Sequence, residues 1–300
     1  MKKLPLVFSG CLLGLAGAGN LILDTLPALS YLFSLTGLIL WIYFLILHLF
    51  NWKETKQELT KPPLLSGMAT FPMAGMILST YVFRVFPHLP LVAQGLWWFS
   101  FLLDLALIAG FTIKFACPGR RVHATPSWTV LYVGIAVAAL TYPLVGIIEI
   151  AYVTLSFGFL LTFYLYPLIY SDLKKHPLSI AMLGQEGIYC APFSLLLASL
   201  VRIGGVSLPT WVLIVMLLAS QSFFFFVLTR LPNILKQGFQ PAFSALTFPT
   251  IITATSLKMA QGILKLPFLD YLVLAETVIC LTILFFVLGA YLIWLRKRSS

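Results

Sequence analysis

The sequence predicts an all-α polytopic membrane protein with ten transmembrane helices, and three observations lead to this fold class. Of the 300 residues, 60% are hydrophobic and 9% are charged, which is too apolar for a soluble globular domain. Ten stretches are apolar over about 20 residues, the length at which an α-helix crosses the hydrocarbon core of a bilayer. Lysine and arginine are concentrated in every second connection. This is expected when successive short loops lie on opposite sides of a membrane and one side collects the positive charges.

The predicted spans follow one another with short connections, so we expect a single transmembrane domain over residues 1–300. The first apolar run continues past Cys11 through Leu23, which indicates a retained membrane helix rather than a secretory signal. The ten ranges are 4–23, 27–50, 64–83, 91–113, 128–148, 150–171, 187–203, 208–229, 240–260 and 268–294.

The loop charges predict that both termini lie in the cytoplasm, because short cytoplasmic loops collect Lys and Arg. The side opposite the termini carries only Arg84, Arg202, Lys258 and Lys265. This asymmetry explains the net charge of +10 without a nucleic-acid partner, and we expect an integral protein of a bacterial inner (plasma) membrane. The remaining basic residues lie on the side of the termini: Lys2, Lys3, Lys53, Lys56, Lys61, Lys114, Arg120, Arg121, Lys174, Lys175, Arg230, Lys236, Arg296, Lys297 and Arg298.

Alternate spans differ in composition. The even-numbered spans carry bulky side chains, for example Trp97 and Trp98 in the fourth, and such residues suit contact with lipid. The odd-numbered spans, called the odd helices below, are rich in small residues and helix breakers, which let backbones approach closely. We therefore expect five antiparallel hairpins with the odd helices inside. The small residues and breakers are Gly10, Gly14, Gly17, Gly19, Gly67, Pro72, Gly75, Gly134, Pro143, Gly146, Gly187, Pro192 and Gly204.

The ninth span is expected to be a broken helix, because Pro249 lacks an N–H and clashes with the preceding turn. In a bilayer, freed backbone groups are tolerated only where protein or water satisfies them. We therefore expect this helix to line a central pore, and the Phe248 ring to plug it.

A weak internal repeat supports the same arrangement. Thr70-Phe71-Pro72 in the third span recurs as Thr247-Phe248-Pro249 in the ninth, and Ala191-Pro192-Phe193 occupies a comparable depth in the seventh. Shared depth and orientation suggest that the hairpins are copies around a common axis, as in many repeat-built transporters. The alternative is that these prolines only kink packed helices.

Further short motifs occur along the chain in a characteristic order. Thr125-Pro126-Ser127-Trp128 precedes the fifth span, which continues with Val133-Gly134, and Arg230-Leu231-Pro232 precedes the ninth. Together with Gly10, Gly14, Ala191-Pro192 and Thr247-Phe248-Pro249, this order resembles the tellurite-resistance and dicarboxylate transporter family, to which the plant slow anion channels are related. The resemblance covers essentially the whole chain.

The resemblance implies five hairpins around a quasi-fivefold central pore lined by the odd helices, in a homotrimer. It also implies that a ninth-helix phenylalanine occludes the pore, and Phe248 is the matching position. One departure concerns the fifth helix, where Ile135 replaces a polar Asn found in several relatives.

The candidate site residues form three groups. Arg84, Arg202 and Lys258 lie near the outer ends of odd helices and are expected to form an electropositive vestibule, or else to snorkel to the interface. Asp104 and Glu276 are acids within even spans, so they are candidates for proton coupling or for pairing between hairpins. Besides Phe248, the expected pore-lining or helix-kinking residues are Gly14, Thr70, Phe71, Pro72, Gly134, Pro192, Phe193, Thr247 and Pro249.

These features favour an anion channel or channel-like transporter that moves small inorganic or organic anions through the pore. The alternative is a proton-coupled exporter of C4-dicarboxylates, sulfite or tellurite. A membrane enzyme or scaffold is less favoured, since no nucleophile with a base and no carboxylate pair is visible. The four cysteines are far apart, so we expect neither a metal nor another cofactor. The expected partners are anions, membrane lipid and two further copies of the chain.

Overall fold

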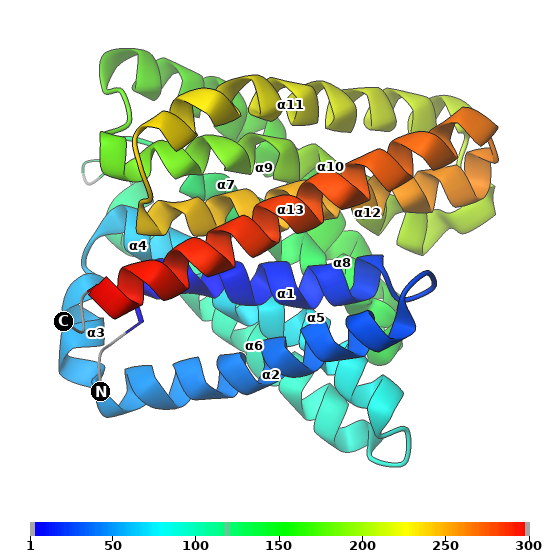
Figure 1. Cartoon of the computed structure of the whole chain (residues 1–300), viewed down its shortest axis with the longest axis horizontal. Helices are drawn as coiled ribbons and strands as arrows, with labels where there is room; N and C mark the ends of the chain where they lie inside the picture. Colours follow the sequence, from blue (N-terminus) through cyan, green and yellow to red (C-terminus); the bar gives the residue numbers. More distant parts are fainter. Residues whose placement is uncertain (1–3, 118, 120, 298–300) are drawn as a thin grey trace.

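The computed structural model describes residues 4–117, 119 and 121–297, which form helices and connections without a β-strand (Figure 1). The predicted all-α fold class is therefore confirmed. Lys2, Lys3, Arg120 and Arg298, four of the basic residues assigned to the cytoplasmic side, lie outside the described residues.

Long helices account for the even-numbered spans. α2, α6 and α13 each begin with a proline, which fits the first turn of a helix because its missing N–H would have no partner there. A short helix, α3 (Trp52–Glu58), follows α2. The long helices are α2 (Pro27–Phe50), α6 (Pro90–Phe111, continued by the π-helical η2, Thr112–Ala116), α9 (Ile148–Lys175), α11 (Thr210–Lys236) and α13 (Pro267–Lys297).

The odd helices are composite, and each changes geometry part-way along its length. Four of them contain 3₁₀ turns, and the third is divided by a turn at Met68 and Ala69. The segments are η1 (Leu6–Phe8) with α1 (Ser9–Leu21); α4 (Pro62–Gly67) with α5 (Thr70–Val85); α7 (Ser127–Val133), η3 (Gly134–Ala136), α8 (Val137–Thr141) and η4 (Tyr142–Leu144); η5 (Ile180–Cys190) with α10 (Ala191–Gly204) and η6 (Gly205–Ser207); and η7 (Pro241–Leu246) with α12 (Thr247–Leu264).

Proline marks three of these changes without opening the backbone. Pro72 and Pro249 are the third residues of α5 and α12, and Pro192 is the second residue of α10. The first N–H groups of an α-helix have no partner within the helix, so proline costs little there. The break expected at Pro249 is thus a change from 3₁₀ to α geometry at Thr247, with the chain helical on both sides.

The odd helices close a ring. α1 contacts α5, α5 contacts α8, α8 contacts α10, α10 contacts α12, and α12 returns to α1. Each of these five also contacts the long helix that follows it, so the chain forms five hairpins in sequence order around the ring. Figure 1 shows α1 between α2 and α13, and both ends of the described chain at the same end of the bundle.

Burial separates the two classes of helix. Only 28–39% of the apolar window of each even helix is buried, against 78% for Pro62–Val85 and 72% for Ser127–Leu144. Among the described residues, eight helices are long and apolar enough to cross a membrane, and Leu6–Leu21 is apolar but shorter. Helical segments occupy all ten predicted ranges, while the count of ten membrane crossings remains a prediction.

Candidate functional site

A narrow cavity, called the inner cavity, lies among the odd helices toward the end of the bundle that holds the termini. Its volume is about 70 Å³, and every odd helix contributes to its lining. The polar lining residues are neutral: Thr70, Ser127, Thr129, Gln185 and Ser244. Two of their hydroxyls also join neighbouring segments, since the Thr70 Oγ1 lies 2.6 Å from the Ser9 Oγ and the Ser127 Oγ accepts a hydrogen bond from the Ser66 Oγ at 2.7 Å.

A wider cavity of about 670 Å³, called the outer vestibule, lies at the opposite ends of the same helices. Arg84, Arg202 and Lys258 all line it, so the three predicted cations are brought together. The Arg84 Nη2 donates a hydrogen bond to the Asn20 Oδ1 at 2.6 Å, which orients the guanidinium without neutralising it.

A layer of protein separates the two cavities, and its thickness is similar on every odd helix. On each odd helix, a residue that lines the inner cavity is followed six or seven residues later by one that lines the vestibule. The pairs are Leu13 and Asn20, Met73 and Thr80, Gly134 and Leu140, Leu195 and Arg202, and Pro249 and Thr255. At 1.5 Å per helical residue, the layer is roughly 10 Å thick.

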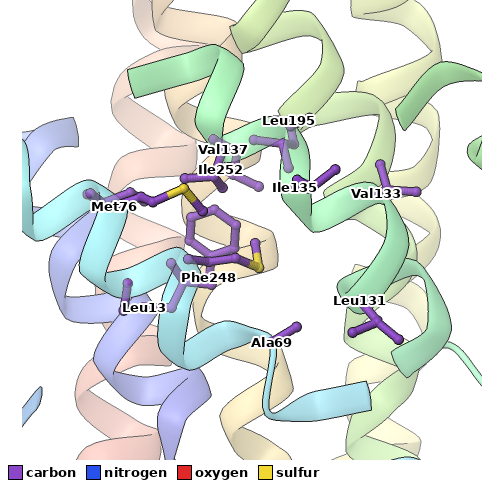
Figure 2. Close-up of a cluster of buried hydrophobic side chains, with 14 of the residues drawn as sticks. Leu13, Ala69, Met76, Leu131, Val133, Ile135, Val137, Leu195, Phe248 and Ile252 are labelled. Carbon is purple, nitrogen blue, oxygen red and sulfur yellow. The ribbon is translucent and has the colours of Figure 1, made fainter. Parts of the chain in front are cut away.

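The Phe248 ring lies within this layer. Figure 2 shows it in the middle of an apolar cluster to which all five odd helices contribute. Phe248 borders the inner cavity and is 4% exposed, while Met76, Val137 and Ile252 line neither cavity. Ile135 of the fifth helix belongs to the same buried cluster. The cluster around the ring is therefore apolar, and hydrophobic constrictions of this kind close by excluding water.

Glycines of α1 make room for the ninth helix. A Cβ atom on Gly17 would lie 3.2 Å from the Phe248 Cδ2, and one on Gly14 would lie 2.7 Å from the Thr247 Oγ1. Gly134 has a comparable role in the fifth helix, where a Cβ would lie 2.6 Å from the Met73 Sδ. Side chains larger than hydrogen at these positions would push the ring and its neighbours out of place.

Two aromatic candidates lie away from the cavities. Phe71 stacks on Trp41 of α2 with ring centroids 4.5 Å apart and an angle of 3° between the planes. Phe193 stacks on Phe223 of α11 at 5.3 Å and 12°. Neither lines the inner cavity or the vestibule, because flat aromatic partners on the even helices hold both rings on the outer side of the ring of odd helices.

Three further candidates also lie outside the cavity linings, while Thr70, Gly134, Pro192 and Pro249 lie inside them. The Thr247 hydroxyl is buried and faces the Gly10 carbonyl oxygen at 2.9 Å, which ties α12 to α1. Gly14 lies at that contact, and Pro72 is buried at the start of α5. For these three residues, a pore-lining or helix-kinking role stays a prediction, and Pro72 lies at the change of geometry between α4 and α5.

The two acids are buried in even helices. Asp104 in α6 is 0% exposed and Glu276 in α13 is 1% exposed. None of their carboxyl oxygens has a hydrogen-bond partner among the described residues, and Gln221 lies close to Glu276 without hydrogen-bond geometry. A buried, unpaired carboxyl group is costly in a bilayer, so both acids remain candidates for a functional role.

Two side-chain amides at the cavities, Gln185 and Asn20, are absent from the sequence-based candidates. Gln185 was missed because the predicted seventh span begins at 187, whereas the helix begins with η5 at Ile180. Asn20 was missed because a single amide near a helix end carries no charge signal. A search for polar residues next to the predicted ends of the odd helices would have included both Gln185 and Asn20.

Comparison with known proteins supplies the family. A family model described as SLAC1, voltage-dependent anion channel, matches residues 3–292. The chain belongs to the SLAC1 family. A search of curated proteins gives no match. Membership confirms the resemblance to the slow anion channels and their transporter relatives, and it indicates an anion channel or transporter in a membrane.

Proposed function

We propose that this SLAC1-family protein conducts small anions along the axis of the five odd helices, and that the Phe248 ring closes the path. One observation carries the proposal: two cavities lined by the same five helices face each other across an apolar layer that contains this ring. Removal of the ring would take an aromatic side chain out of this layer without adding a charge.

The charge distribution supports an anion as the permeant species. The vestibule holds three cations, whereas the described residues that line the inner cavity offer neutral hydroxyl and amide groups and no charge. Cations at the mouth raise the local anion concentration, whereas a fixed charge at mid-depth would hold an anion too tightly for rapid exit. The predicted homotrimer would carry one such path in each subunit.

The test is a planar-bilayer recording of wild type and Phe248→Ala with chloride, nitrate and sulfate in turn. We expect anion-selective currents at least about tenfold larger for Phe248→Ala, because the variant removes an obstruction from the axis. Thermal unfolding of both proteins is the control. If Phe248→Ala is destabilised by about 3–5 kcal/mol and carries no added current, Phe248 is a packing residue and the gate is disproved.

A second candidate is a proton-coupled exporter of C4-dicarboxylates, sulfite or tellurite. It is supported by Asp104 and Glu276, since buried acids without partners among the described residues are typical of proton carriers in membranes. A steep dependence of flux on the pH gradient would favour this candidate. Flux that follows only the anion gradient and the membrane potential would favour the channel.

A further inference from the structure

The outer vestibule contains an acid as well as its three cations. Asp24, in the connection between α1 and α2, lines the vestibule, and its Oδ2 lies 3.1 Å from the Lys258 Nζ. The same Nζ donates a hydrogen bond to the Leu21 carbonyl oxygen at 2.8 Å. Lys258 is thus tied at its tip to the outer end of the first hairpin.

The three cations differ in their partners. Among the described residues, Arg84 donates a hydrogen bond to the neutral amide of Asn20, whereas Lys258 forms a salt bridge with Asp24. Counting three cations and the Asp24 carboxylate, the net charge of the vestibule is +2, and without Asp24 it is +3.

We infer that Asp24 is a tethered anion that competes with permeant anions for Lys258 and sets the preference of the vestibule between monovalent and divalent anions. The inference rests on the proposed function, because it assigns a role within the same path. The Asp24 side chain is 76% exposed and that of Lys258 is 28% exposed, and exposed ion pairs are weak. An arriving anion can therefore displace the carboxylate.

Lys258 can bind an anion both when Asp24 is paired with it and when Asp24 has moved away. An ammonium group has three N–H donors, and two are engaged by the Leu21 carbonyl and by Asp24. One donor is available with Asp24 in place, and a second becomes available when the carboxylate moves away.

The effect on selectivity follows from electrostatics. A change in vestibule potential multiplies the local concentration of a monovalent anion by a factor, and that of a divalent anion by the square of this factor. If Asp24→Asn raises chloride entry about twofold, sulfate entry should rise about fourfold. Asp24 in the native protein therefore holds back divalent anions more than monovalent ones.

The experiment uses the Phe248→Ala protein with and without Asp24→Asn, with chloride or sulfate on the outer side at a matched ionic strength of about 10 mM or about 1 M. At about 10 mM the screening length is about 30 Å and the carboxylate acts across the vestibule, whereas at about 1 M it is about 3 Å. We expect the Asp24→Asn variant to carry about twofold more chloride current and about fourfold more sulfate current at low salt, with both gains lost at high salt. Glu149→Gln is the matched control, because Glu149 is an exposed acid that does not line the vestibule.

Equal gains for chloride and sulfate, gains that persist at high salt, or the same gains in Glu149→Gln would overturn the inference. If no variant carries anion current, the proposed function fails, and a second measurement decides the role of Asp24. Sulfate should then raise the melting temperature of Asp24→Asn more than that of wild type, because a ligand stabilises the folded state that binds it. Equal stabilisation of both proteins would show that Asp24 does not compete for the site.

Discussion

The third and ninth helices carry the same tripeptide, yet they present it differently. Thr70-Phe71-Pro72 and Thr247-Phe248-Pro249 each begin an α-helical segment of an odd helix, with proline as the third residue. In the third helix, Thr70 lines the inner cavity and Phe71 stacks on Trp41. In the ninth helix, Phe248 and Pro249 line the cavity and the Thr247 hydroxyl faces the Gly10 carbonyl.

The difference shows that contacts with neighbouring helices decide which residue of a repeated motif faces the axis. Successive residues of an α-helix are about 100° apart, so a rotation of one position exchanges the residue that faces inward. Trp41 of α2 offers a flat surface and an Nε1 donor to the Phe71 carbonyl at 2.9 Å, which holds Phe71 outward. Around α12, the small residues of α1 leave space for Thr247 and for the edge of the Phe248 ring.

Among the variants that test this comparison, Phe71→Ala is expected to have the largest effect on stability. Phe71 is 1% exposed and stacks on both Trp41 and Phe44, so its removal should destabilise the protein by about 3–5 kcal/mol. We expect a lower melting temperature and no increase in anion current, the reverse of the result expected for Phe248→Ala. An open channel in Phe71→Ala would mean that the two helices are functionally equivalent.

Phe248→Leu tests how the anion current depends on the size of the apolar side chain at this position. Leucine keeps an apolar side chain in the layer but has less reach than a phenyl ring, so we expect a current between those of wild type and Phe248→Ala. Bilayer recordings of the three proteins at equal protein density measure this order. A current in Phe248→Leu as small as that of wild type would show that any large apolar side chain closes the path.

The sequence was sufficient for the features that depend on composition and loop charge. Alternation of small and bulky spans predicted which helices are buried, because each class suits a different environment. Arg84, Arg202 and Lys258 could be expected near one another, because each lies near the same end of an odd helix. Family resemblance then selected Phe248 among 25 phenylalanines as the predicted gate, a choice that hydrophobicity alone does not make.

The rotation of each helix could not be predicted from the sequence. Phe71, Phe193 and Phe248 are each next to a proline at a similar depth, and only contacts with Trp41, Phe223 and the α1 glycines distinguish them. These partners lie far away in the sequence, so local periodicity contains no information about them. The same limit applies to Asp24, whose salt bridge with Lys258 joins the connection after the first helix to the ninth helix.

Arg202→Gln should have a moderate effect that depends on salt. The residue lines the vestibule, so loss of its charge should lower the anion current of the Phe248→Ala protein about two- to threefold at low ionic strength. The deficit should shrink as salt screens the remaining field. Lys265→Gln is a suitable control, because Lys265 follows α12 at the outer end and does not line the vestibule. A deficit independent of salt would indicate a folding defect or a direct binding site.

The smallest effect is expected for the buried acids of the even helices. If Asp104 and Glu276 are protonated, Asp104→Asn and Glu276→Gln replace one neutral group with another of nearly the same shape, so we expect each melting temperature to change by less than about 3 °C. Under the channel hypothesis, the anion current is also unchanged in both variants. Under the coupled-exporter hypothesis, stability is preserved while flux no longer responds to a pH gradient. Thermal unfolding combined with flux measurements at two pH gradients separates these outcomes, and a large loss of stability in either variant would show that its carboxylate is charged and paired across the assembly.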